Sequence, residues 1–213
     1  VVTGQVGKIR FSQTGTPANP NAGGEVDLLK GEAQFQYTGT KVGQDGWQAE
    51  LLDTNGNVVA TVTAGQATVK WTAGPPKQLV VTPEQTLTRT VGQNARLIAT
   101  VLDEYDNPVQ GVDVTFTLKE TTRTGATDGV VLKTGTSNAQ GRVILVHSAT
   151  ETGMDTIEVT SGSLTAVQRT VTWTPGPVAT IELTFAPNPP KAGADVTVTA
   201  TVTDAGGNRV GGA

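Results

Sequence analysis

A near-repeat with a period of about 100 residues constrains this chain more than any other feature of its sequence. Residues 198–204, VTATVTD, match residues 97–103, LIATVLD, at a spacing of 101 residues. The segment WTAGP at 71–75 recurs as WTPGP at 173–177, at a spacing of 102 residues. Two landmarks with nearly the same period predict repeated domains of one fold.

Apolar side chains occupy every second position in two neighbouring stretches, which are separated by a turn rich in Asp, Asn and Pro. A period of two is typical of strands with one buried face, whereas a helix needs a period of 3.6. The alternating positions are Ala95, Leu97, Ala99 and Val101, followed by Val112, Val114, Phe116 and Leu118. We therefore expect a hairpin-like unit of a β-sandwich here.

The composition favours many short strands joined by turns, because Gly (26) and Pro (11) are frequent and only 16% of residues are charged. A net charge of −4, with no cluster of Lys or Arg, argues against binding to nucleic acid or to an acidic membrane surface. The chain has no cysteine, which excludes disulfides, thiolate metal sites and a cysteine nucleophile. Stability must then come from packing and backbone pairing.

Between the two Gly-Pro segments, turn signals separate seven or eight short strand patterns within about 100 residues, which is typical of an immunoglobulin-like sandwich. The expected strands are residues 78–82, 86–90, 95–102, 112–118, 130–134, 142–148, 156–160 and 164–173. The predicted fold class is all-β, with tandem immunoglobulin-like sandwiches. We assign residues 75–175 to a complete sandwich, residues 1–74 to the C-terminal part of one, and residues 176–213 to the N-terminal part of another.

The first segment begins with a strand-like stretch at residues 1–11. A further strand is expected at residues 32–38, where Ala33, Phe35 and Tyr37 alternate with polar residues. Strands at residues 46–53 and 57–69 flank Asn55-Gly56, a pair that favours a tight type I′ hairpin turn.

The residues from ATVLDEYDNPVQGVDVTF to TGTSNAQGRVILVHSATETGMDTIEVTSG resemble the bacterial immunoglobulin-like domain of the invasin and intimin type. GEAQFQYTGTKVGQDGWQAEL, from Gly31, is similar to the segment that begins at Gly141. The resemblance implies a stalk or spacer module of a bacterial surface protein, in which only certain terminal domains bind receptors. It also implies an extracellular location.

His147 is the only histidine, so a Ser-His-Asp arrangement is formally conceivable. However, His147 aligns with Tyr37, and no sequence around a serine resembles a nucleophile elbow. A packing role is the favoured interpretation, and replacing His147 by Phe is expected to leave the biological role intact. We predict no enzymatic activity, no catalytic residues and no cofactor.

The turn from Asp103 to Asn107 gathers three carboxylates and an amide, a composition that can hold Ca²⁺. The equivalent turn at Asp204 has lost two of these carboxylates, which favours hydrogen bonding of the turn backbone over a metal site. We therefore predict no metal site, while Ca²⁺ at the Asp103–Asp106 turn stays open. Lysine–asparagine isopeptide crosslinks, for which Lys30, Lys70, Lys77, Lys119 and Lys133 are formal candidates, also stay open.

The three tryptophans raise the question whether the chain binds carbohydrate on a flat aromatic surface. Trp71 and Trp173 recur at matching strand ends, and Trp47 aligns with Ile157, a position of the core pattern. Recurrence at domain ends favours packing.

The sequence thus predicts a structural repeat of a microbial extracellular fibre, stalk, surface layer or adhesin. Alternatives are a receptor- or glycan-binding adhesin module and a decoration domain of a viral particle. A binding module should expose aromatic residues in its loops, and residues 17–24 and 121–128 contain none. Expected partners are adjacent repeats or copies of the chain, joined head to tail, and possible partners include a host or cell-surface ligand; nucleic acid and membrane insertion are not expected.

Two further expectations concern packing. One core is expected to bury Leu97, Val101, Val114, Phe116, Val143, Leu145, Ile157, Val159 and Val171, with Thr100, Thr115 and Thr117 on the outer face. Residues 178–213 correspond to the first part of a sandwich and residues 1–72 to the rest. We expect the first part to be completed by the rest from the next copy, covalently or between subunits, which would generate a filament.

Overall fold

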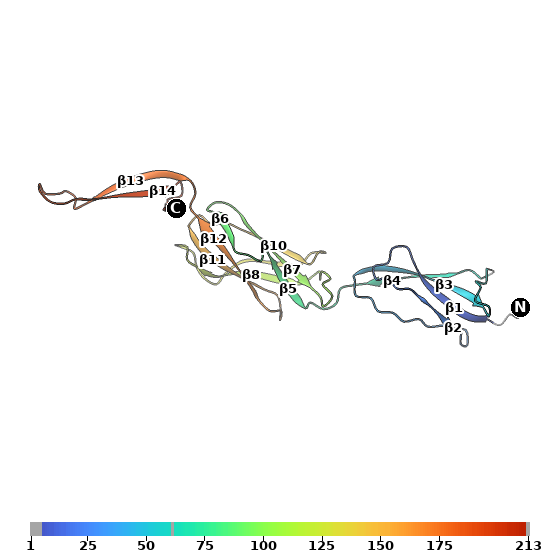
Figure 1. Ribbon diagram of the computed structural model, residues 1–213. Coiled ribbons are helices and arrows are strands. Elements are labelled where there is room, and N and C mark those ends of the chain that lie inside the picture. Colours follow the sequence, from blue (N-terminus) through green and yellow to red (C-terminus); the bar gives the residue numbers. More distant parts are fainter. Residues whose placement is uncertain (1–5, 61, 212–213) are drawn as a thin grey trace. The chain divides into compact units, whose positions relative to one another are not determined.

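The computed structural model describes residues 6–60 and 62–211, and within these ranges the chain forms strands, turns and loops without a helix (Figure 1). The chain divides into two compact units. The first comprises Val1–Pro75 together with the turn Asp103–Asn107, and the second comprises Pro76–Leu102 and Pro108–Ala213. The all-β immunoglobulin-like fold predicted from the sequence is confirmed.

The first unit contains one antiparallel sheet with strand order β2-β1-β3-β4. Its strands are β1 (Val6–Thr14), β2 (Gly24–Asp27), β3 (Gly43–Asp53) and β4 (Gly65–Trp71). An aromatic cluster covers one face of this sheet, where the rings of Phe11 and Phe35 stack at 5.6 Å and those of Tyr37 and Trp47 approach to 4.8 Å.

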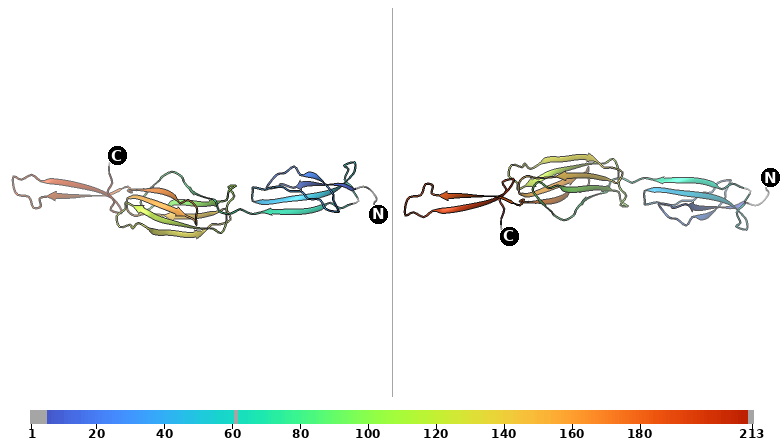
Figure 2. Two further views of the ribbon diagram at one scale, coloured as in Figure 1. Left: turned by 90° about the horizontal axis from the view of Figure 1, so that it is seen from below. Right: turned by 90° about the horizontal axis from the view of Figure 1, so that it is seen from above.

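The second unit contains a sandwich of two sheets, with strand orders β10-β7-β5 and β6-β12-β11-β8-β9. Both views of Figure 2 show these strands stacked in two layers. The strands are β5 (Gln78–Thr82), β6 (Leu87–Thr90), β7 (Ala95–Leu102), β8 (Asp113–Thr121), β9 (Val130–Thr136), β10 (Arg142–His147), β11 (Gly153–Thr160) and β12 (Val167–Thr174). All eight lie where the sequence predicts them.

Alternation of side chains along the strands explains the core of this sandwich. The burial of β7 follows a strict period of two, and β8 does the same over Asp113–Leu118. The nine residues predicted to share the core are all buried, and Phe116 is 0% exposed. Thr100, Thr115 and Thr117 are half-buried on the other face.

The second unit also contains a two-stranded antiparallel ribbon of β13 (Val178–Ala186) and β14 (Thr197–Asp204), coloured orange to red in Figure 1. These strands correspond to β5 and β7, because Ile181 pairs with Val202 as Leu79 pairs with Val101. Every residue of β13 is exposed.

The predicted strand at residues 32–38 is wrong. Its only ladder contact is the bridge between Leu29 and Glu32, although exposure still alternates from Ala33 to Thr38. The counterpart of this segment in the sandwich is β10, which pairs with β7. The sheet of the first unit contains no counterpart of β7, so an extended segment has no edge to join.

The predicted type I′ turn at Asn55-Gly56 is also wrong, although a turn is present. Gly56 has a positive φ of 83°, but Asn55 does not, and type I′ requires both. Asp53 instead accepts hydrogen bonds from the backbone N–H groups of Asn55 and Asn57. The following strand begins at Gly65, later than the predicted residue 57. The first five residues of the predicted strand 1–11 lie outside the described residues.

Truncation of Phe116 to Ala should lower the free energy of unfolding of the sandwich by about 3–5 kcal/mol, because it leaves a cavity in a fully buried site. Urea denaturation followed by circular dichroism would measure this loss. Thr115→Ala, on the outer face of the same strand, is the matched control and should cost less than about 1 kcal/mol. Equal losses for the two variants would show that the side-chain register is wrong.

Candidate functional site: buried carboxylates at strand ends and joints

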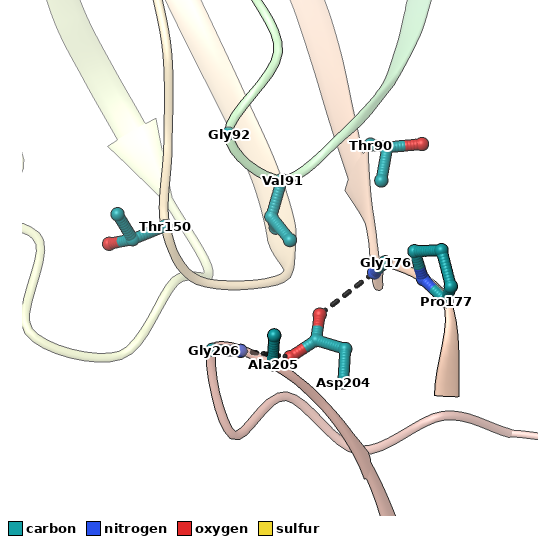
Figure 3. A pocket seen from close by; sticks show the side chains of 9 residues that line it. All are labelled: Thr90, Val91, Gly92, Thr150, Gly176, Pro177, Asp204, Ala205 and Gly206. Atoms are coloured by element: carbon teal, nitrogen blue, oxygen red, sulfur yellow. Dashed lines mark hydrogen bonds between the residues drawn. The ribbon is translucent and has the colours of Figure 1, made fainter. Parts of the chain in front are cut away.

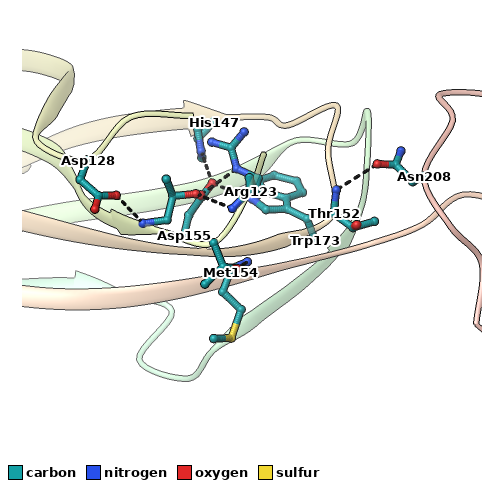
Figure 4. A network of polar contacts seen from close by, with 10 residues as sticks. Arg123, Asp128, His147, Thr152, Met154, Asp155, Trp173 and Asn208 are labelled. Carbon is teal, nitrogen blue, oxygen red and sulfur yellow. Dashed lines mark hydrogen bonds and ion pairs between the residues drawn. The ribbon is translucent and has the colours of Figure 1, made fainter. Parts of the chain in front are cut away.

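The most extensive polar network of the sandwich is built around Asp155, the third residue of β11, which is 0% exposed (Figure 4). Asp155 Oδ2 accepts hydrogen bonds from the indole Nε1 of Trp173 and from Nε2 of His147, each at 2.8 Å. Its Oδ1 accepts from Arg123 Nε and from Thr121 Oγ1, each at 2.7 Å. One carboxylate thus joins β11, β12, β10 and the end of β8.

The hydrogen bonds keep this carboxylate ionised despite its burial. Burial by itself raises the pKa of Asp155. The hydrogen bonds from His147 and Arg123, followed by those from Thr121 and Trp173, outweigh burial and hold the pKa well below its usual range. The charge is balanced by Arg123 at 2.7 Å, so Asp155 acts as the acceptor centre of a closed network.

The first unit repeats this arrangement around Asp45, which is 0% exposed and is the third residue of β3. Asp45 Oδ2 accepts from Trp71 Nε1 at 2.6 Å and from the Tyr37 hydroxyl at 3.2 Å. Its Oδ1 accepts from the backbone N–H of Asn19 at 2.9 Å. Burial raises the pKa of Asp45, and these hydrogen bonds again lower it overall.

His147 and Tyr37 therefore have the same task, which is to donate a hydrogen bond to a buried carboxylate. The His147 ring also packs edge-on against Trp173, with centroids 5.7 Å apart, as Tyr37 packs against Trp71 at 5.5 Å. The two strand-end tryptophans are anchored by their N–H groups. These contacts agree with the packing roles expected for His147, Trp71 and Trp173.

A second kind of buried carboxylate lies in the turns. In the first unit, Asp103 Oδ1 accepts from the backbone N–H groups of Tyr105 and Asn107, and Asp103 Oδ2 accepts from the N–H of Gly74 at 2.9 Å. The side chain of Asn107 donates to the Thr40 carbonyl at 2.8 Å. Its Oδ1 accepts from the N–H of Val42 at 3.0 Å, so the turn is tied to both a Gly-Pro segment and a loop.

The second unit contains the same bonds around Asp204. Asp204 Oδ2 accepts from the N–H of Gly176 at 2.8 Å, and Oδ1 accepts from the N–H of Gly206 (Figure 3). Asn208 donates to the Thr150 carbonyl at 3.0 Å and accepts from the N–H of Thr152 at 3.1 Å. We call each set, Gly74 with Asp103 and Asn107 and Gly176 with Asp204 and Asn208, a joint clasp.

The joint clasp of the second unit borders a shallow hollow, which Figure 3 shows from close by. Its lining comes from Thr90–Gly92, Thr150, Gly176-Pro177 and Asp204–Gly206. Asp204 is the only titratable group in this lining, and its carboxylate is engaged by the clasp. The hollow therefore presents no free catalytic group.

Turn chemistry explains the Asp and Asn residues that raised the question of Ca²⁺. Asp53, Asp103 and Asp204 each accept from backbone N–H groups two and four residues later. The residue before the closing Asn has positive φ, at Gly56, Asp106 and Gly207. Among residues 6–60 and 62–211, no three His, Asp or Glu side chains gather closely enough to hold a metal ion.

Sequence analysis missed Asp45, Asp155 and the loop contacts of Asn107 and Asn208. A signal for the first pair was present, since Gly-x-Asp recurs at 43–45 and 153–155 with the spacing of 110 residues that relates Tyr37 to His147. The loop contacts left no such signal, because backbone groups of any sequence can make them.

No family model matches the chain, and no curated protein matches it. Solved structures similar to it include domains 4 and 5 of the S-layer protein SbsC, with 17% identity, a TM-score of 0.35, and coverage of 62% of this chain and 66% of that one. The Escherichia coli adhesin FdeC shares 20% identity over 79% of this chain and 52% of that one, with a TM-score of 0.43.

A third similar structure is the β-glucuronidase of Parabacteroides merdae, with 12% identity, a TM-score of 0.34, and coverage of 78% of this chain and 21% of that one. The chain thus spans less than two thirds of each of these three structures. The part of the chain that the structure describes contains no helix long and apolar enough to cross a membrane.

Replacing Asp155 by Asn should lower the free energy of unfolding by about 3–5 kcal/mol, because it leaves the Arg123 charge buried without its partner. The measurement is urea denaturation at neutral pH. Glu158→Gln is the matched control, since it removes the exposed ion pair with Lys119 and should change stability little. A small loss for Asp155→Asn would contradict the central role of this carboxylate.

The Asp103 clasp should make stability depend on pH. Burial raises the pKa of Asp103, but hydrogen bonds from Gly74, Asn107 and Tyr105 outweigh this and lower it from 3.8 to about 2. A depressed folded-state pKa stabilises the fold above the unfolded-state value and loses that effect as the pH falls through the folded-state value.

Melting temperatures of the wild-type chain should therefore fall between about pH 4 and pH 2. Asp103→Asn should melt lower at neutral pH and should lose part of this acid sensitivity. Parallel pH profiles for the two proteins would show that the clasp carboxylate does not contribute.

Proposed function

We propose that this chain is a non-enzymatic structural repeat of a microbial extracellular fibre, stalk, surface layer or adhesin, joined head to tail to further copies or repeats. The observation that carries the proposal is the repetition of the joint clasp. Gly74 and Gly176 lie 102 residues apart, and each donates its N–H to a turn carboxylate. The resemblance of the sequence to bacterial immunoglobulin-like domains agrees with this proposal.

A clasp of this kind suits a protein whose successive segments must keep a fixed orientation. In the second unit, the hydrogen bonds of Asp204 and Asn208 connect the turn after β14 to the Gly-Pro segment and to the loop between β10 and β11. Three hydrogen bonds to two separate segments restrain a short connection more than the peptide linkage alone does, because each restricts backbone rotation. When a strand is pulled along its length, several backbone hydrogen bonds to its neighbours bear the force at the same time.

The buried polar groups support a role without catalysis. Asp45 and Asp155 each accept hydrogen bonds from several donors, and His147 is 11% exposed at its side chain and bonded to Asp155. A catalytic base needs a reachable proton donor in a cleft, together with a nucleophile or a polarised substrate. These groups instead stabilise strand ends.

A receptor- or glycan-binding module is a second class of function. Aromatic side chains supply much of the binding energy of such surfaces. The loops 17–24 and 121–128 contain none, which favours the scaffold.

Pulsed electron paramagnetic resonance can test the stiffness of the joint, because a chain without cysteine accepts two unique spin labels. Labels at Lys133→Cys and Glu182→Cys, both exposed, span the clasp of the second unit. We expect a narrow distance distribution that broadens in Asn208→Ala, since this change removes the bonds to Thr150 and Thr152.

Arg209→Ala is the matched control, because Arg209 is exposed and its neighbouring clasp residue is retained. Its distribution should stay as narrow as that of the labelled wild-type chain. A broad distribution in the wild-type chain, unchanged by Asn208→Ala, would count against a stiff structural repeat.

A further inference from the structure

The sandwich begins with a segment that passes from one sheet to the other. β5 is an edge strand of the three-stranded sheet, where it pairs antiparallel with β7. β6 is an edge strand of the five-stranded sheet, where it pairs parallel with β12, the last strand of the sandwich. Residues 83–86 form the crossover between β5 and β6. The first segment of the sandwich is therefore bonded to both sheets.

The ladder between β6 and β12 covers only the second half of β12. The four residues of β6 pair with the last four residues of β12, and the ladder ends with Thr90 opposite Thr174. Beyond it, the N–H of Val91 donates to the Thr174 carbonyl at 2.9 Å. Residues 167–170 of β12 come before the point at which β6 begins to pair. The first half of β12 therefore has no ladder to β6.

The side chain of Arg169, the third residue of β12, makes a connection where this ladder is missing. Its Nε donates to the carbonyl oxygens of Val81 and Pro83, each at 3.0 Å, and its Nη2 donates to the Val81 carbonyl at 2.8 Å. Its Nη1 donates to the Gln168 carbonyl of its own strand at 2.8 Å. Val81 belongs to β5 and Pro83 to the crossover, so one guanidinium joins the edges of the two sheets.

A guanidinium group suits this contact because it is planar, always charged and carries several N–H donors in fixed directions. Hydrogen bonds from a charged donor are stronger than those between neutral groups. Val81 is 0% exposed, so water cannot replace a donor that its carbonyl loses. The half-buried Arg169 therefore supplies hydrogen bonds for which the fold offers the carbonyl no solvent substitute.

The parallel pairing of β6 and β12 determines how the sandwich bears tension. Further segments of the chain precede Lys77 and follow Pro175, so tension along the chain enters before β5 and leaves after β12. It pulls β6 toward its first residue and β12 toward its last residue. Because the two strands run in the same direction, these pulls slide one strand along the other and load their hydrogen bonds together. An antiparallel pair would open one bond after another.

Tension that enters before β5 reaches β5 and the crossover before it reaches the ladder. β5 is held by five residue pairs with β7, and Arg169 adds bonds from β12 at the point where β5 ends. The strand that leaves the sandwich is thereby bonded directly to the strand that enters it. Without these bonds, β5 and the crossover can separate from the sandwich before the ladder bears the full load.

We propose that Arg169 is a force-bearing latch that, together with the β6–β12 ladder, holds the two ends of the sandwich against tension. The latch deepens the proposed function, on which its biological meaning rests, by naming the contacts that carry the load in one repeat. All of these contacts lie within the complete sandwich of the second unit.

Optical tweezers can apply this tension to the full chain. Lys77→Cys and Pro175→Cys place DNA handles just outside β5 and β12, in a chain without other cysteines. The length released on unfolding, at ~3.3–3.6 Å per residue between the handles, identifies the sandwich. We expect Arg169→Met to lower the mean unfolding force by roughly one third or more, since it removes charge-assisted bonds that share the load. Arg142→Met, at an exposed arginine of β10, is the matched control and should keep the wild-type force.

Two further variants separate a latch from a general contribution to stability. Arg169→Lys keeps the charge but loses the fixed fork of donors, so its unfolding force should be intermediate. Val143→Ala truncates a buried residue of β10, a strand outside the path of the load. It should lower the urea midpoint at least as much as Arg169→Met and still leave the unfolding force close to the wild-type value. Unfolding forces that simply follow the urea midpoints of the variants would contradict the latch.

A second pulling direction provides an internal control. Gln93→Cys with Pro175→Cys places both handles beyond the same end of β6 and β12, so the pull opens the ladder from that end. The unfolding force should be roughly half the axial value or less, because the bonds then break in succession. Arg169→Met should leave this force unchanged, since Arg169 lies near the other end of β12.

An axial force that Arg169→Met leaves unchanged, or a loss of equal size in both pulling directions, would overturn the proposal. The outcome is independent of the spin-label test of the joint. A stiff joint beside a sandwich that is insensitive to Arg169 would leave the proposed function standing and remove the latch. A flexible joint beside a sandwich whose axial force depends on Arg169 would keep the latch and count against the proposed function.

Discussion

A buried carboxylate that must remain ionised is the constraint on which each folded unit depends. Asp155 and Asp45 have no access to water, so every hydrogen bond that water would have made must come from the protein. The donors come from segments far apart in the chain and in both units include a strand-end tryptophan, Trp71 of β4 or Trp173 of β12. The full set of hydrogen bonds can therefore form only when the strand that carries the tryptophan pairs in the observed register. Packing supplies most of the stability, and the carboxylate selects one arrangement of the strand ends.

Buried carboxylates also accept hydrogen bonds in the two joint clasps, where they connect a turn to other segments. A turn of the form Asp-x-x-x-Asn closes on itself through the aspartate Oδ1, which leaves Oδ2 and the asparagine amide available for other backbone groups. Asp103 and Asp204 use that capacity to hold a glycine N–H, and Asn107 and Asn208 use it to hold a loop. Asp53 forms the turn alone. This common turn motif thus forms a joint clasp only where a Gly-Pro segment donates a glycine N–H to its aspartate.

Equivalent strands are buried to different extents in different parts of the chain. The sandwich of β5–β12 buries its apolar faces within one chain, whereas β13 and β14 expose the faces that β5 and β7 bury. The sheet of the first unit contains counterparts of β8, β9, β11 and β12, and the segment that corresponds to β10 stays unpaired.

The all-β class, the eight strands of the sandwich and the buried residues of five of them could be predicted from the sequence, because a period of two is a local pattern. The alignment of Tyr37 with His147 likewise followed from the repeat. The absence of strand pairing at residues 33–38 could not be predicted, because pairing depends on whether the folded chain places a neighbouring strand edge beside them. The hydrogen-bonding roles of Asp45 and Asp155 likewise depend on the fold, because their donors come from segments far apart in the chain. The loop partners of Asn107 and Asn208 are backbone groups, which every residue type provides, so the sequence holds no signal for them.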